Sequence, residues 1–169
     1  MDEKFTVGLI VSNRFGVLNR VAGLYSKRGY NIDSLAVGVT ENPRFSRMTI
    51  VSTGDDYMKE QVVRQLRKLH DVKTVTLFKQ GEMVSVEHML IKLKTSGGNK
   101  AGISERINAH GGKVRDFGDD FITADITGST EALDAFVNEV RPLGILELCR
   151  SGLISVAHGA GDTLRVVES

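Results

Sequence analysis

The chain has 169 residues, which is enough for one domain or for two small ones. Its 22 lysine and arginine residues nearly balance 21 aspartate and glutamate residues, so the composition shows no basic footprint for nucleic acid or for an anionic membrane surface. The single cysteine, Cys149, excludes an internal disulfide bond and is typical of a reducing compartment. Because Cys149 lies in an apolar stretch, we expect a buried thiol.

The first half of the sequence alternates between the two-residue period of strands and the 3.6-residue period of helices. The expected elements are strand 5–11, helix 16–28, strand 32–40, strand 45–53, a helix that begins after the cap at 54–56 and ends near residue 70, and strand 72–78. Gly29 ends the first helix, and Pro43 marks a turn between two strands. The order βαββαβ is that of the ferredoxin-like split unit.

A second unit is expected after a polar, glycine-containing linker at residues 79–82. Its strand around 89–93 recurs 82 residues after the first strand, and Gly111 recurs 82 residues after Gly29. The remaining expected elements are a weak helix at 100–109, strands 113–117 and 121–127, a helix that Ser129 or Thr130 caps and Pro142 ends, a closing strand over 145–156, and an irregular tail of about ten residues. We therefore predict an α+β fold of two tandem βαββαβ domains, 1–80 and 83–169.

The segment from Ser12 to Asn31 carries the strongest functional signal. An apolar strand enters a polar loop that leads directly into an amphipathic helix. The free N–H groups and the dipole at a helix N-terminus favour an anion, so a small ligand with a carboxylate would suit this loop. The alternative is a loop that binds nothing, in which Asn13 only caps the turn.

The amino-acid sequence of this segment resembles that of a known family. A strand, a loop that ends in Gly16-Val17-Leu18, a helix and the run from Arg28 to Leu35, RGYNIDSL, resemble the amino-acid-sensing ACT domain. With the run SRMTI, Ser46 to Ile50, the sequence is similar to the regulatory (small) subunits of acetolactate synthase, also called acetohydroxyacid synthase. The resemblance covers nearly the whole chain and is most specific in residues 5–52.

The resemblance implies a regulatory site formed between two copies of the chain. A branched-chain amino acid, most often valine, would bind at the interface of a homodimer that forms through the first domain. The implied effector-binding residues are Asn13, Arg14, Phe15, Gly16, Val17 and Leu18 of one chain and Asn31 of its partner. Val37 is a weaker candidate for contact with the isopropyl group. From the residues alone, Asn31 is equally well a turn residue, and Phe15 and Tyr30 are expected to be packing residues.

The resemblance also implies partners for this chain. A larger catalytic subunit would carry thiamin diphosphate, FAD and magnesium, and would condense pyruvate with a second 2-oxo acid. This chain would carry no cofactor of its own. It would activate the catalytic subunit and confer feedback inhibition.

The sequence shows no catalytic or metal-binding motif. Its four histidines are scattered, and it contains no nucleophile elbow, Walker loop or Rossmann glycine motif. The glycine loop at 96–99 lacks the Lys and Ser/Thr of a phosphate-binding loop. The alternative that the second domain binds a nucleotide effector stays open. We therefore predict neither catalytic nor metal-ligating residues.

Several alternatives remain beside the regulatory subunit. An ACT-type regulator of a different biosynthetic enzyme fits most of the same residues. A DNA-binding regulator would need a helix-turn-helix and a basic face, which the sequence lacks. A small enzyme would need a catalytic set. With no membrane-length apolar run and no signal-peptide pattern, we expect a cytoplasmic protein, or one of an equivalent reducing compartment, without a membrane or nucleic acid as partner.

Overall fold

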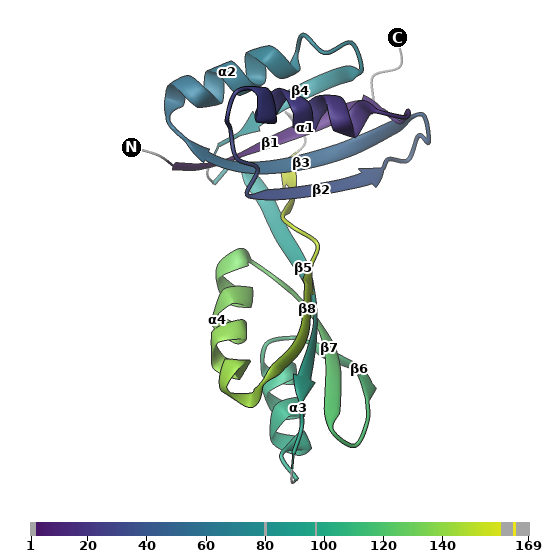
Figure 1. The fold of residues 1–169 in the computed structure, drawn as a ribbon, viewed down its shortest axis with the longest axis vertical. Helices are drawn as coiled ribbons and strands as arrows, with labels where there is room; N and C mark the ends of the chain where they lie inside the picture. The colour runs from purple at the N-terminus through teal and green to yellow at the C-terminus, as the bar shows by residue number, and fades with distance from the viewer. Residues whose placement is uncertain (1–2, 80, 97, 160–163, 165–169) are drawn as a thin grey trace. The chain divides into compact units, whose positions relative to one another are not determined.

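The structure is a computed structural model that describes residues 3–79, 81–96, 98–159 and 164 (Figure 1). Contacts between residues divide the chain into two units. The first contains the residues up to Ser85 together with the described residues from Leu153 onward, and the second contains Val86–Gly152. The helices and strands follow the order βαββαβ twice, and a short strand comes after them. The predicted α+β class with ferredoxin-like units is confirmed.

The first unit is a four-stranded antiparallel sheet with two helices. Its elements are β1 (Glu3–Ser12), α1 (Val17–Lys27), β2 (Ser34–Val39), β3 (Phe45–Gly54), α2 (Asp56–Leu66) and β4 (Val72–Phe78). The strand order is β2-β3-β1-β4, so β1 is a central strand. Alternate residues of β1, Val7, Leu9 and Val11, pack into the core with the buried stripes of both helices. This packing fixes the loop after β1 at one end of the sheet.

The opposite face of β1 is buried as well. Thr6 and Ile10 are almost inaccessible, and a Cβ on Gly8 would lie 2.5 Å from Leu164 and 2.7 Å from Phe78. Leu164, from near the end of the chain, therefore packs on the face of the sheet away from the helices. Glycine at position 8 leaves room for this close approach.

The expected closing strand over 145–156 is in fact two strands, β8 (Ile145–Arg150) and β9 (Ile154–Ala157). Gly152, with a φ of 78°, interrupts the strand conformation between them. The segment after it belongs to the first unit, where Arg47 Nη2 donates to the Ser155 carbonyl at 2.5 Å. The predicted domain 83–169 differs from this division, because the segment from Leu153 onward has its contacts in the first unit.

The second unit repeats the architecture around its own core. Its elements are β5 (Met83–Lys94), which starts in the first unit, α3 (Lys100–Ala109), β6 (Lys113–Phe117), β7 (Phe121–Gly128), α4 (Thr130–Val140), a 3-10 turn (Arg141–Leu143) and β8. The strand order is β6-β7-β5-β8, and β9 pairs with β5. A separate apolar cluster from both helices and the sheet fills this core.

Cys149 is exposed, so the expectation of a buried thiol is wrong. In the register of β5 with β8, Cys149 lies opposite Leu90, whereas Ile91 next to Leu90 points into the core. Because side chains alternate along a strand, Leu90 and Cys149 lie on the sheet face away from the helices. An apolar neighbourhood in sequence did not imply burial here, because the helices pack on the other face of this sheet; Leu90, on the central strand β5, is exposed as well.

The helix ends follow local capping chemistry. The Asp55 carboxylate accepts from the Met58 N–H at 2.8 Å at the start of α2, and the Ser129 hydroxyl accepts from the Ala132 N–H at 3.2 Å at the start of α4. The α2 helix ends at Leu66, not near residue 70, and gives way to turns in which the N–H groups of Lys68 and Leu69 bond three residues back.

Parts of the predicted connections cannot be compared with the structure. Three of them lie outside the described residues: residue 80 of the expected linker, residue 97 of the glycine loop and the expected tail apart from Leu164. Among the residues that are described, no helix is both long and apolar enough to cross a membrane.

Candidate ligand-binding site

The loop after β1 is held between two turns at the end of the first sheet. The Ser12 N–H donates to the Asp71 carbonyl at 2.8 Å, in the turn between α2 and β4. The Asn13 N–H donates to the Arg44 carbonyl at 2.7 Å, and Asn13 Nδ2 donates to the Pro43 carbonyl at 2.9 Å. Three hydrogen bonds thus tie this loop to both neighbouring turns, and one Asn13 amide hydrogen is used in doing so.

Gly16 forms the N-terminal cap of α1 in the left-handed conformation, with φ 81° and ψ −4°. This conformation is easily reached only by glycine, and no side chain caps the helix. Within the described residues, no hydrogen-bond acceptor is found for the backbone N–H groups of Leu18 and Asn19. The first turn of α1 therefore offers free donors and the positive end of the helix dipole to a ligand.

The residues around Gly16 divide between core and surface. Val17 is buried in the core beneath α1, whereas Leu18 is partly exposed. Phe15 is fully exposed, at 103%, so its expected role as a packing residue is wrong. The left-handed turn at Gly16 directs the chain into the helix and leaves the Phe15 ring in solvent. Tyr30 packs against the first core, as expected.

Asn31 lies beyond the other end of α1. Its Nδ2 donates to Asp33 Oδ1 at 2.6 Å, and the second oxygen of Asp33 accepts from the Thr53 hydroxyl at 2.7 Å. A helix of 11 residues is about 16 Å long, so within one chain Asn31 is far from the loop before Gly16. One chain therefore brings residues 13–18 together but leaves Asn31 apart from them.

Exposed apolar side chains lie on the elements that flank these groups. Val37 and Val39 are on β2, which is the edge strand of the first sheet, and both are about half exposed. Val37 lies opposite the buried Met48 and therefore on the helix-bearing face of the sheet. An exposed apolar edge strand is a surface on which a second strand can pair.

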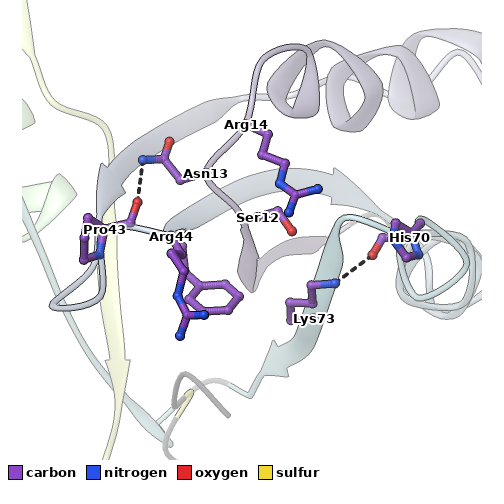
Figure 2. Close-up of a pocket in the computed structure, with 8 residues that line it drawn as sticks. Ser12, Asn13, Arg14, Pro43, Arg44, His70 and Lys73 are labelled. Atoms are coloured by element: carbon purple, nitrogen blue, oxygen red, sulfur yellow. Dashed lines mark hydrogen bonds between the residues drawn. The ribbon is translucent and has the colours of Figure 1, made fainter. Parts of the chain in front are cut away.

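A cavity of about 450 Å³ opens where the three connections meet (Figure 2). Its lining residues are Ser12, Asn13, Arg14, Pro43, Arg44, Phe45, His70 and Lys73. Of these, only Asn13 and Arg14 are among the effector-binding residues that the resemblance implies. Sequence reasoning missed the residues of the other two connections, which lie far from the loop in sequence and match no motif.

The described part of the chain contains no group of three or more His, Cys, Asp or Glu side chains that could hold a metal ion. The cysteine and the four histidines bring no such cluster together there.

The fold and the open helix start together define a class of protein, a tandem of βαββαβ domains whose first domain is of the ACT type. A family model described as "AHAS small subunit-like ACT domain" matches residues 7–74, and one described as "Small subunit of acetolactate synthase" matches residues 86–159. The chain belongs to the family of acetolactate synthase small subunits, and the predicted resemblance is confirmed.

Relatives across bacteria and archaea share nearly the full length of this chain. The acetolactate synthase small subunit of Mycolicibacterium smegmatis is 40% identical over 91% of both chains. The isozyme 3 small subunit of Salmonella typhimurium is 38% identical over 90% of this chain and 94% of its own. The crystal structure of the acetolactate synthase small subunit from Thermotoga maritima, at 31% identity, superposes with a TM-score of 0.88 and covers 94% of this chain and 99% of its own.

Proposed function

We propose that this chain activates the catalytic subunit of an acetolactate synthase and makes that enzyme sensitive to feedback inhibition by a branched-chain amino acid, valine in the first place. The observation that carries this proposal is the open start of α1. There, the glycine cap and the free N–H groups of Leu18 and Asn19 provide a place for an amino acid's carboxylate. The chain's membership of the small-subunit family supplies the partner enzyme.

The proposed effector site needs two copies of the chain. The residues from Asn13 to Leu18 would hold the carboxylate, and Asn31 of a second copy would contact the bound amino acid. Two observations support this arrangement: Asn31 is about a helix length away within one chain, and the exposed Val37 and Val39 lie on a free edge strand. Pairing of two β2 strands would bury these valines and bring the two half-sites together.

The reaction itself would take place on the larger catalytic subunit, which would bind thiamin diphosphate, FAD and magnesium. Valine would act by binding more tightly to one state of the assembly than to another. Coupling free energies between such sites are typically about 1–3 kcal/mol, which corresponds to a change of about fivefold to 150-fold in the affinity of one site for its ligand.

The test is reconstitution with the purified catalytic subunit of the same organism. Turnover of pyruvate is measured with and without this chain, and each mixture is titrated with valine, leucine and isoleucine. We expect the chain to raise turnover and to make it sensitive to one of these amino acids. Unchanged turnover and no response would favour a regulator of another biosynthetic enzyme. D-Valine controls for a non-specific effect of the amino acid.

A further inference from the structure

Asp33 holds the side chain of Asn31, the residue that a second copy of the chain would contribute to the proposed effector site. Asn31 Nδ2 donates to Asp33 Oδ1 at 2.6 Å, and the Thr53 hydroxyl donates to Asp33 Oδ2 at 2.7 Å. The Asp33 N–H donates to the Val51 carbonyl at 2.8 Å. Because Val51 and Thr53 belong to β3, Asp33 is tied to the first sheet through both its backbone and its carboxylate.

The chemistry of Asp33 decides which way round the Asn31 amide lies. An ionised carboxylate has acceptors only, so the group that faces it at 2.6 Å must be the amide NH2 and not the amide oxygen. Asn31 Oδ1 therefore lies on the side of the amide that is turned away from Asp33. Within the part of the chain that the structure describes, no donor reaches this oxygen, and Asn31 is exposed. An acceptor is thus presented in a fixed direction.

We propose that Asp33 is a positioning residue of the effector site: by fixing the Asn31 amide, it directs Asn31 Oδ1 to the α-ammonium group of the bound ligand. This role rests on the proposed function, in which Asn31 of one copy contacts a ligand at the start of α1 of another. The free N–H groups there would bind the carboxylate. The two half-sites together would then bind both charged groups of an amino acid.

This arrangement selects α-amino acids against 2-oxo acids of the same carbon skeleton. An ammonium group has only donors, whereas an oxo group has only acceptors. An oxo oxygen would face Asn31 Oδ1, and Asn31 cannot turn its NH2 to the ligand without placing Oδ1 against the Asp33 carboxylate. A site rejects a ligand strongly when that ligand leaves its polar groups unpaired. The effector site would therefore respond to the amino acid and not to the 2-oxo acids that are the proposed substrates of the catalytic subunit.

The test compares two ligands of the purified full-length chain by calorimetry, L-valine and the 2-oxo acid of the same carbon skeleton. We expect the wild-type chain to bind valine at least about a hundredfold more tightly. Asp33→Asn keeps the size of the side chain, but an amide can either accept from Asn31 or donate to it, so both orientations of Asn31 become possible. We expect weaker binding of valine and tighter binding of the 2-oxo acid, so that the affinity ratio falls about tenfold.

Asp33→Asn also removes a negative charge, so the same substitution is repeated in an Asn31→Ala background. If Asp33 acts through Asn31, Asp33→Asn should leave the affinity ratio of the Asn31→Ala chain unchanged. An equal fall of the ratio in both backgrounds would overturn the positioning role. Asp116→Asn, at an exposed aspartate of β6 in the second unit, is the matched control and should leave the ratio at its wild-type value.

The remaining outcomes separate this role from the proposed function. If valine binds but Asp33→Asn leaves the affinity ratio unchanged, Asp33 only stabilises the turn before β2 and the positioning role is wrong. Equally tight binding of valine and the 2-oxo acid by the wild-type chain would also overturn it. A wild-type chain that binds none of valine, leucine and isoleucine would contradict the proposed function itself, and the role of Asp33 with it.

Discussion

Arg20 lies against the place that a side chain at Gly16 would occupy. A Cβ built on Gly16 would be 3.2 Å from Arg20 Nη1, and the same guanidinium is held by Asp71. A larger residue at position 16 must therefore move Arg20 as well as adopt a left-handed φ. Glycine keeps the start of α1 open, which is the property that the proposed effector site needs.

Gly16→Asp should remove most of the valine inhibition of the reconstituted enzyme while activation is retained. The new carboxylate would repel the effector carboxylate and block the approach to the backbone. Sequence reasoning expects Asp to be tolerated at a helix start, but the left-handed φ of 81° adds a cost of about 1–2 kcal/mol. Valine titration of the reconstituted enzyme measures the inhibition, and urea unfolding of the variant measures the loss of folding stability.

Gly16→Asn is the matched control for this prediction. Asn has nearly the same shape as Asp, adopts the left-handed conformation more readily than most residues and carries no charge. We expect it to retain more of the valine inhibition than Gly16→Asp. Identical loss in both variants would mean that steric blocking, not charge repulsion, is the cause.

Asn31→Ala should weaken inhibition by valine about tenfold or more, because it removes a polar contact to the bound amino acid from the second copy. In the structure, Asp33 and Thr53 hold the Asn31 amide in one orientation, so the contact is already positioned. Asn108→Ala, an exposed asparagine of α3, is the control. If Asn31→Ala retained the wild-type valine titration curve, the residue would be only a turn residue.

Val37→Asp should dissociate a homodimer of this chain into monomers. It places a charge in the middle of the exposed edge strand β2, where pairing would bury the side chain. Light scattering on the full-length protein gives the mass, with Val84→Lys as a control at another exposed valine. A wild-type protein that is monomeric at high micromolar concentration, with and without valine, would contradict the proposed dimer.

Arg150→Met should destabilise the second unit by about 2–4 kcal/mol, because it leaves a buried carboxylate without its partner. Glu87, only 5% exposed, is bound by Arg150 Nη2, and Arg150 Nη1 also contacts Asp134 at 2.5 Å. Asp134 is largely exposed, so Asp134→Asn should cost less than about 1 kcal/mol. Urea unfolding compares the two variants, and equal costs would contradict this account.

The stabilising effect of Arg115 should depend on pH. Its hydrogen bonds to Asp125, at 2.6 and 2.9 Å, lower the pKa of that carboxyl group below its ordinary value. The stabilisation is therefore present above the unfolded pKa of about 3.9 and is lost as the pH falls through the lower folded pKa. Arg115→Gln should be less stable than wild type at neutral pH, and the difference should vanish in strong acid. A difference independent of pH would refute the assignment.

Local patterns in the sequence were sufficient to predict most of the helices and strands. The alternation in β4 and the helical stripe of α2 were readable because burial on one face imposes a period on the residues. Gly16 was recognisable as the start of α1 from its place before Val17. The exposed Phe15 and Cys149 were not predicted correctly, because exposure depends on which groups from elsewhere in the chain cover a side chain.

By itself, the sequence determined the order βαββαβ, its duplication and the family of the chain, since these depend on residues that are close together in the sequence. Only the tertiary structure decided that the segment from Leu153 returns to the first unit, and that Arg44 and Lys73 share a cavity with Arg14. The physical reason is that these relationships are contacts between segments far apart in the chain. They are set by sheet register, by loop hydrogen bonds and by the burial of Gly8 against Leu164, none of which leaves a periodic pattern.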